Sequence, residues 1–155
     1  MKTYKIVFLI SFTLFSFSAI SQDCTNYHSE KCKWADDSFL YSRQSKSALY
    51  TPGMSSEFVI TVYDEEYYIS IKGDKSLGKI RIRVKEDNEE KTVLYDNSKY
   101  KYEDFFYFLN ENTRNLIIEV SSEANKKFSS SADRNCLGVL IEFRNENSTK
   151  KEIGF

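Results

Sequence analysis

Proline, glycine and histidine are scarce in this sequence. Its 155 residues include one proline, five glycines and one histidine, His28. No linker, low-complexity segment or internal repeat divides the chain, and a chain of this length suits one domain. A serine hydrolase triad would need His28, and neither a Gly-x-Ser-x-Gly motif nor a glycine-rich phosphate loop is present. The sequence therefore predicts a single domain without a recognisable hydrolase or nucleotide-binding signature.

A hydrophobic run long enough to cross a bilayer is also missing. Lys2 and Lys5 introduce a mostly apolar run of 12 residues, 6–17, whereas about 20 are needed to span the membrane. Small residues follow at 19–21, at the positions that a signal peptidase reads. Residues 1–21 are therefore expected to be a signal peptide. The cleaved chain is expected to be exported to the periplasm, the outer surface or the medium, and not to span the membrane.

Neither sign of charge is in large excess. Without residues 1–21 the chain has 134 residues, with 20 Lys and Arg against 23 Asp and Glu. Such a surface has no bias toward nucleic acid or anionic lipid. The sequence carries no cofactor motif, so no cofactor and no nucleic-acid partner are expected.

Cysteine is limited to Cys24, Cys32 and Cys136, and an exported chain favours one disulfide among them. Cys24, His28 and Cys32 are spaced four apart, so on a helix the two cysteine Cα atoms would be about 12 Å apart, too far for a bond. Either this segment is a loop and Cys24 pairs with Cys32, or it is helical and one of them reaches Cys136. The remaining cysteine would stay free or link two chains into a disulfide-bonded dimer. A zinc site made of Cys24, His28 and Cys32 would usually need a fourth ligand, so no metal is expected.

Alternation of apolar and polar residues predicts an all-β fold. In the stretch 57–71, two alternating runs flank the acidic residues 64–66, which we interpret as the central hairpin of the domain. Further strands are expected near residues 38–42, 47–50, 79–85, 92–95, 104–109, 116–120 and 137–143. Short strands with turn residues between them are typical of a single-domain antiparallel β-sandwich, here jelly-roll-like with a short N-terminal segment that contains cysteine.

The expected organisation follows from these strands. Residues 22–56 form an N-terminal segment that packs on the sandwich, 57–143 form its core, 144–155 form a polar tail, and 121–135 form a long exposed loop. The buried core is expected to contain Phe58, Ile60, Val62, Ile69, Ile71, Ile80, Ile82, Val84, Phe106, Phe108, Leu116, Ile118, Val120, Val139 and Ile141.

One expected strand carries a row of basic residues, Lys79, Arg81, Arg83 and Lys85, that alternate with apolar ones. Such a row is usually the solvated face of a strand, which discourages pairing with other chains. The alternative is a binding stripe for an anionic polymer.

The order of features after residue 57 follows a known pattern. An alternating strand leads to an acidic turn, then to a strand with tyrosine that ends near Ile71, and later to a strand that ends in Leu94-Tyr95-Asp96. Over residues 57–143 this order resembles the bacterial pre-peptidase C-terminal-like β-sandwich, although the glycines usual in its hairpin turn are missing. The whole chain is also similar to small exported proteins of Bacteroidetes-type bacteria. The resemblance implies a sandwich fold, and a shared fold does not carry function with it.

Three classes of function are compatible with these features. We predict the first, a non-catalytic exported protein of the cell envelope that is a binding or structural interaction module for a protein or a surface polymer. The second is a glycan- or small-ligand-binding module in which exposed rings act as stacking platforms. The third is a small hydrolase built on His28. The candidate binding residues are Tyr95, Tyr100, Tyr102 and Trp34. Three or more exposed coplanar rings would favour the glycan module.

Overall fold

The structure is a computed structural model that describes residues 23–124 and 135–145. The expected signal peptide, most of the loop 121–135 and most of the tail 144–155 lie outside these residues. The elements in chain order are α1 (Tyr27–Lys31), β1 (Leu40–Tyr41), β2 (Lys46–Tyr50), β3 (Ser55–Val62), β4 (Glu65–Gly73), the 3₁₀ helix η1 (Lys75–Leu77), β5 (Ile80–Glu86), β6 (Val93–Asp96), the 3₁₀ helix η2 (Asn97–Tyr100), β7 (Phe105–Asn110), β8 (Arg114–Ser122) and β9 (Asn135–Arg144).

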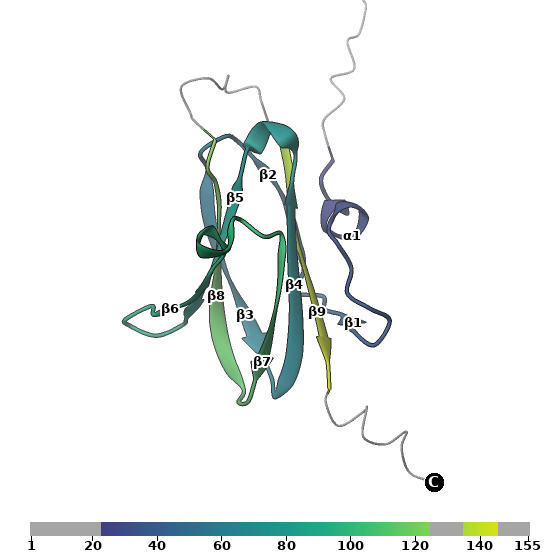
Figure 1. Cartoon of the computed structure of the whole chain (residues 1–155), viewed down its shortest axis with the longest axis vertical. Coiled ribbons are helices and arrows are strands. Elements are labelled where there is room, and N and C mark those ends of the chain that lie inside the picture. The colour runs from purple at the N-terminus through teal and green to yellow at the C-terminus, as the bar shows by residue number, and fades with distance from the viewer. Residues whose placement is uncertain (1–22, 125–134, 146–155) are drawn as a thin grey trace, which may run out of the picture.

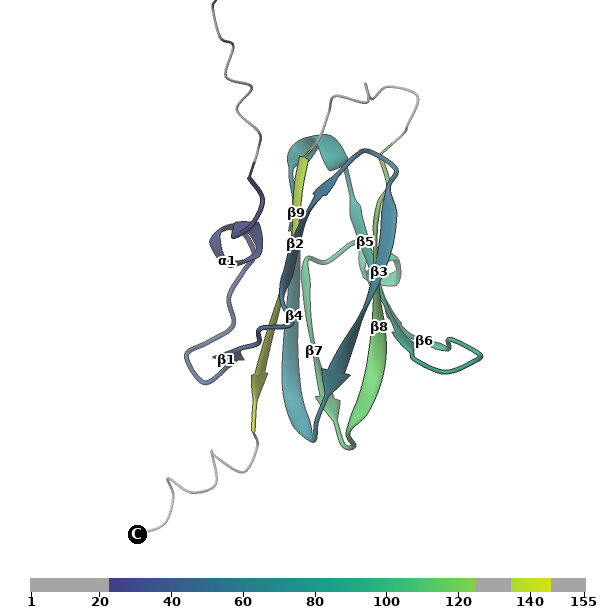
Figure 2. The ribbon, with the colours of Figure 1, turned by 180° about the vertical axis from the view of Figure 1, so that it is seen from behind.

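The strands form two antiparallel sheets that pack face to face (Figures 1 and 2). Sheet A has the order β1-β9-β4-β7, with β2 also paired to β9, and sheet B has the order β3-β8-β5-β6. The chain passes from one sheet to the other at nearly every connection from β2 to β9, which is the winding of a jelly roll. The prediction of an all-β, jelly-roll-like sandwich is confirmed.

The predicted central hairpin at 57–71 is wrong. β3 pairs with β8, whereas β4 pairs with β7 and β9, so the two halves of this stretch lie in different sheets. The crossing is held at Tyr63, whose N–H donates to the Tyr67 hydroxyl at 2.9 Å and whose carbonyl accepts from Asn110 Nδ2 at 2.5 Å. Period-two alternation shows that one face of each strand is buried, but it does not show which strand lies alongside.

Side chains from both sheets fill the space between them. Every residue of the predicted core lies there, with Phe58, Ile80 and Phe108 only partly buried. Tyr67, Leu77 and Leu137 also belong to it. Fully burying an aliphatic or aromatic side chain contributes about 1.5–3 kcal/mol relative to leaving it exposed, so this layer is the main source of stability.

The outer face of sheet A is covered by residues 23–39, which we call the outer strap. In both ribbon views α1 lies outside β9, on the side away from sheet B, and the strap leads into β1, which pairs with β9. A disulfide joins Cys24 to Cys136 at the start of β9, so the helical alternative is confirmed. α1 packs so closely on Gly138 that a Cβ there would lie 2.6 Å from the Cα of His28. The glycine in β9 is therefore what lets the helix approach the sheet.

Polar and aromatic contacts hold the rest of the strap. The N–H of Ala35 donates to Glu142 Oε2 at 2.8 Å, and the Ser70 hydroxyl donates to the Lys33 carbonyl at 2.7 Å. The ring of Phe39 packs edge-on against Tyr68, with centroids 6.2 Å apart. Because β9 is covered on both faces, its sequence is apolar on both faces.

Cys32 is the cysteine left outside the disulfide. It is buried, and its thiol donates to the Gly138 carbonyl at an Sγ–O distance of 3.3 Å. Burial raises the pKa of this thiol to about 11. A dimer linked through Cys32 would require the strap to leave the sheet first, and that dimer stays a prediction.

Within residues 23–124 and 135–145, the outer face of sheet B carries ion pairs and no covering segment. Glu119 on β8 accepts from Arg83 and Lys85, and Lys85 also contacts Glu57 at 2.8 Å. Arg81 makes two hydrogen bonds to Asp96, of 2.5 and 3.1 Å. Three members of the predicted basic row are therefore paired with acids of neighbouring strands, and this face is not a free basic stripe.

Candidate functional site

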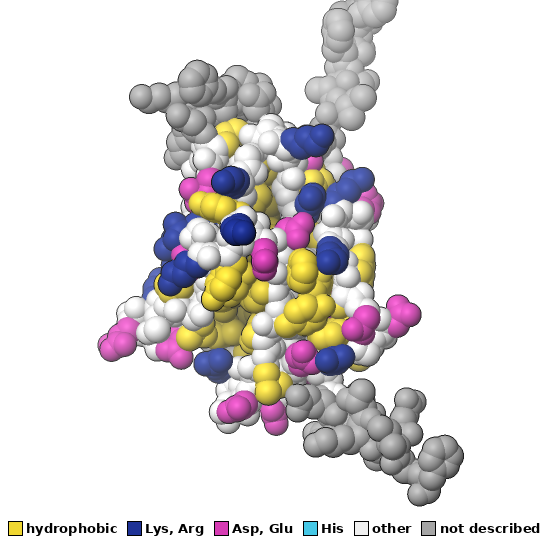
Figure 3. Space-filling view, viewed as in Figure 1, with side chains coloured by type: hydrophobic (Ala, Val, Ile, Leu, Met, Phe, Trp, Pro, Cys, Tyr) yellow, Lys and Arg dark blue, Asp and Glu magenta, His cyan; other side chains and the backbone are white. Residues whose placement is uncertain are grey.

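One long side of the sandwich is open, because β6 ends sheet B and β7 ends sheet A there. The two edges are joined by residues 97–104, here called the crossing loop, which includes η2 and runs from sheet B to sheet A. Figure 3 shows hydrophobic side chains gathered at the centre of this face, where Figure 1 places β7. Tyr95, Tyr100 and Tyr102 all lie on or beside the crossing loop.

Asn97 fixes the crossing loop to sheet B. This buried side chain accepts the N–H of Ile82 at 2.9 Å and donates to the carbonyls of Ile80 and Glu103 at 3.0 and 3.1 Å. The preceding residue, Asp96, accepts hydrogen bonds from Arg81 and from the N–H and hydroxyl of Ser98. These bonds hold the pKa of its carboxyl far below the usual value. The loop is therefore anchored before any ligand arrives.

Two consecutive residues of the crossing loop have a left-handed backbone. Lys101 has φ 55° and Tyr102 has φ 60°. Neither is glycine, and such conformations cost on the order of 1–3 kcal/mol each unless the surroundings impose them. The Tyr102 N–H donates to the Asn97 carbonyl at 2.9 Å, which helps to impose this one. Strain of this kind is concentrated at functional sites.

Below the crossing loop, β6 and β7 enclose an apolar groove of about 320 Å³, here called the edge groove. Its lining includes Leu94, Tyr95, Phe106 and Leu109. The Tyr95 ring is stacked between Tyr100, at 5.4 Å and 5°, and Phe106, at 4.0 Å and 21°. Burial raises the pKa of Tyr95 to about 12, so its hydroxyl stays protonated. Rings stacked face to face cover one another, so they do not form the coplanar platform expected of a glycan module.

In the part of the chain that the structure describes, the outer edge of β7 pairs with no other strand. The N–H of Ile71 donates to the Asp104 carbonyl at 2.7 Å, and the register to β4 continues from that pair to Asn110. Since backbone groups alternate in direction along an antiparallel strand, the N–H and C=O groups of Phe105, Tyr107 and Leu109 point away from β4. No strand of the described residues pairs with them.

The other edges of the two sheets carry features that discourage pairing with another chain. At β3, the Gln44 side chain bonds both the N–H and the C=O of Thr61, at 2.7 and 2.9 Å. β6 has four residues, and its partner β5 has a register shift next to it. β2 begins with the exposed residue Lys46. β7 has the sequence Phe-Phe-Tyr-Phe-Leu-Asn, with no charge, proline or bulge. Such an edge is a template for another strand.

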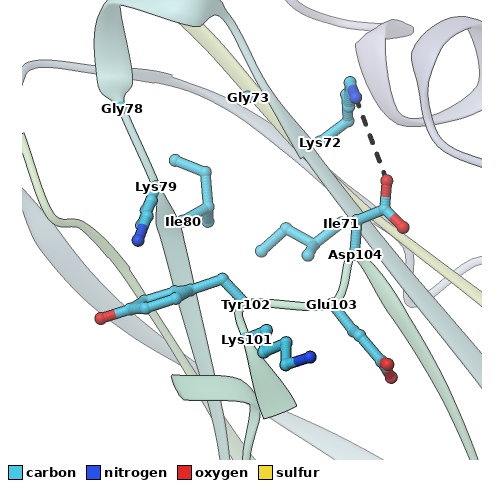
Figure 4. Close-up of a pocket in the computed structure, with 10 residues that line it drawn as sticks. All are labelled: Ile71, Lys72, Gly73, Gly78, Lys79, Ile80, Lys101, Tyr102, Glu103 and Asp104. Carbon is cyan, nitrogen blue, oxygen red and sulfur yellow. Dashed lines mark ion pairs between the residues drawn. The ribbon is translucent and has the colours of Figure 1, made fainter. Parts of the chain in front are cut away.

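Above the crossing loop lies a second cavity, of about 380 Å³, here called the lysine pocket (Figure 4). Ile71 from β4 and Ile80 from β5 both extend into the space between the two strands and form an apolar floor (Figure 4). Lys79 lies over the Tyr102 ring, 5.0 Å from its centroid. Lys101 also lines the pocket, and Lys72 lies 4.0 Å from Asp104. Lys79, the fourth member of the basic row, therefore lines this pocket.

Trp34 lies apart from the three tyrosines, on the outer strap. Its ring is 46% exposed and packs at 6.1 Å and 39° to Tyr41. The structure therefore groups Tyr95, Tyr100 and Tyr102 on one side of the molecule and leaves Trp34 on the far layer.

His28 connects the strap to sheet A. Its Nδ1 lies 2.7 Å from the Ser47 hydroxyl, and its Nε2 lies 3.0 Å from the Tyr41 hydroxyl. Ser47 also accepts the backbone N–H of His28 at 2.8 Å, which ties α1 to β2. Burial lowers the pKa of His28. These bonds make His28 a structural clamp, and Ser47 rather than a carboxylate lies at Nδ1, where a triad places its acid.

Sequence reasoning missed Asn97 and Lys101 as parts of a site, and it considered Lys79 only as part of the alternative binding stripe. The only signal in the sequence was the uncharged run at 105–109. Such a run is unusual for an edge strand, but only the structure shows that β7 is an edge strand.

Within the described residues, no group of three or more His, Cys, Asp or Glu side chains could hold a metal ion. In that same part of the chain no helix is long and apolar enough to cross a membrane.

No family model and no curated protein matches the chain. Among solved structures, it is similar to PliG of Aeromonas hydrophila, a periplasmic lysozyme inhibitor of g-type lysozyme. The sequence identity is 7%, the TM-score is 0.45, and the match covers 72% of this chain and 92% of that one.

Proposed function

We propose that the protein is a non-catalytic, exported binding module of the cell envelope that adds an extended segment of a partner protein to the free edge of β7. The observation that carries this proposal is the outward backbone of Phe105, Tyr107 and Leu109 on an uncharged strand. Strand addition gives affinity through backbone hydrogen bonds and specificity through pockets for alternate side chains. The Cys24–Cys136 disulfide supports export, since disulfides persist in oxidising compartments.

The edge groove would supply the side-chain specificity. It lies beside β7 between the two sheets and is lined by apolar and aromatic side chains. A segment paired to β7 would direct alternate side chains toward this groove and the others toward solvent and Tyr107. The partner segment should therefore alternate apolar and polar residues.

The test uses a display library of random decapeptides with free carboxyl ends, selected against the disulfide-bonded protein. We expect enrichment of peptides with alternating apolar residues, and protection of the Phe105, Tyr107 and Leu109 amides from hydrogen exchange when a selected peptide binds. Leu109→Pro removes an outward donor without removing a bond to β4, so it should weaken binding at least about 10-fold, the equivalent of about 1.4 kcal/mol. Leu109→Thr also removes the leucine side chain from the edge groove but keeps the donor, so it should bind more tightly than Leu109→Pro.

Two results would overturn the proposal. One is a library that yields no peptide able to distinguish the protein from Leu109→Pro. The other is equal binding by Leu109→Pro and Leu109→Thr, which would show that β7 pairing is not involved.

His28→Ala should keep peptide binding, whereas a hydrolase built on His28 would lose its activity.

The glycan alternative has one observation in its favour, the exposed pair Trp34 and Tyr41. Aromatic faces of this kind bind sugar rings by stacking. Trp34 is the sole tryptophan of the chain, so titration with soluble cell-wall oligosaccharides should quench its fluorescence if this pair binds glycan. We expect no change, because the two rings are tilted by 39° and do not form one platform.

A further inference from the structure

The lysine pocket lies at the amino-terminal end of β7, and this position gives it a role that rests on the proposed function. Residues 101–104 line the pocket, and β7 begins at the next residue, Phe105. A segment that pairs antiparallel with β7 runs in the opposite direction, so its carboxyl end arrives at Phe105. The end of the partner segment would therefore meet the pocket.

Three lysines and two acids, Glu103 and Asp104, line the pocket, so its charge is positive on balance. The Glu103 side chain is directed away from Ile71 and Ile80 (Figure 4). Lys72 is neutralised by Asp104 at 4.0 Å. Within the described residues, no ion pair joins Lys79 or Lys101 to a carboxylate. Lys79 is exposed apart from its contact with the Tyr102 ring, and Lys101 is exposed too. Two unpaired ammonium groups thus stand on either side of Tyr102.

The floor of the pocket suits an apolar side chain. Ile71 and Ile80 both extend into it from the two flanking strands (Figure 4). Ile80 is only partly buried although it packs against the core. A terminal residue with an aliphatic side chain would cover this floor while its carboxylate reaches the lysines.

The left-handed backbone at Lys101 and Tyr102 is explained by the same role. It turns the chain so that the two side chains flank the pocket, and Asn97 maintains it through the Tyr102 N–H and the Glu103 carbonyl, at 2.9 and 3.1 Å. A binding site held ready before the ligand arrives loses less free energy on binding.

We propose that the lysine pocket binds the free C-terminal carboxylate and the last apolar side chain of the segment that pairs with β7. The partner is therefore a protein whose own extended carboxyl terminus is apolar and accessible. The carboxylate contacts Lys79 and Lys101, and the last side chain lies on Ile71 and Ile80.

The test uses one peptide selected as described above, synthesised with a free carboxyl end and with a carboxamide end. Fluorescence polarisation with the disulfide-bonded protein should show at least about 10-fold weaker binding of the amide. Lys79→Gln and Lys101→Gln should each weaken the acid several-fold and leave the amide unchanged. Lys99→Gln is the matched control, because Lys99 is exposed on the same loop and does not line the pocket.

The outcomes separate this inference from the proposed function. Equal binding of acid and amide, with Leu109→Pro still deleterious, would overturn the carboxylate site and leave strand addition standing. An equal effect of Lys99→Gln would reduce the result to general charge attraction and would also overturn it. Loss of binding on acetylation of the peptide amino end instead would show a parallel strand, with the amino end at Glu103 and Asp104. A library that yields no binder would overturn both proposals.

Discussion

The outer faces of the two sheets differ in what covers them. Sheet A is covered by the outer strap, which is joined by a disulfide, a close helix contact and a buried carboxylate, whereas sheet B is covered only by its own charged side chains. Two of the buried acids, Glu142 on sheet A and Glu119 on sheet B, show the difference. Burial raises the pKa of Glu142 under the strap. On sheet B burial would also raise the pKa of Glu119, but the hydrogen bonds from Lys85 and Arg83 outweigh it and the pKa is lowered. The two faces should therefore respond to pH with opposite sign.

The largest effect is expected from removing the disulfide. Replacing both Cys24 and Cys136 with Ala should lower the free energy of unfolding by about 2–5 kcal/mol, since this crosslink closes a very long loop. Urea unfolding measures the loss, and Trp34 fluorescence should report release of the strap. The same stability with an unchanged Trp34 signal would show that the strap does not depend on this bond.

The next effect isolates the helix contact on sheet A. Gly138→Ala would place a methyl group 2.6 Å from the Cα of His28, and such overpacking costs about 1–3 kcal/mol. In the variant without the disulfide the cost should be smaller, because α1 is then freer to move away. An equal cost in both backgrounds would contradict the view that α1 is what the methyl group meets.

On sheet B, Glu119→Gln should lower stability at pH 7 by about 1–3 kcal/mol, because two cations lose their shared partner. The folded pKa of Glu119 lies below its usual value, so its stabilisation is present above the unfolded pKa and is lost as pH falls through the folded one. Wild type and variant should therefore converge on acidification below about pH 4.5. A constant difference from pH 7 to pH 3 would contradict this prediction.

The smallest effect is expected from Glu142→Gln, which keeps an acceptor for the Ala35 N–H. The folded pKa of Glu142 is raised, so its protonated form favours folding at low pH and this advantage is lost as pH rises from the unfolded value through the folded one. The variant should be as stable as the wild type or slightly more stable at pH 7, by less than about 1 kcal/mol, and relatively less stable near pH 4. Thermal unfolding at the two pH values gives the sign.

The sequence was most informative where one strand face is buried. Ile60, Ile118 and Ile141 could be placed in the core because alternation depends on the strand alone. Pairing could not be predicted in the same way, because the partners of β3 and β4 depend on residues far along the chain. The ion pairs of Arg83 and Lys85 were missed for this reason, since Glu119 is more than thirty residues away from both.

The candidate site shows the same limit. Tyr95, Tyr100 and Tyr102 are close in sequence, so a local pattern could group them, and the structure places them around one loop. Lys79 joins them only through the fold. Trp34 could not be separated from them by sequence, because its position depends on where the outer strap lies.

The jelly-roll winding has a consequence for how the chain matures as it emerges from its amino-terminal end. β2 pairs with β9, and β3 pairs with β8, so neither sheet can form completely until nearly the whole chain has emerged. Cys24 likewise precedes Cys136 by 112 residues, whereas Cys32 is close to Cys24 in the sequence. Oxidation of Cys24 before Cys136 is available would join it to Cys32, which is not the bond of the folded protein. In that case the native bond would require thiol–disulfide exchange that frees Cys32 before the outer strap closes over it.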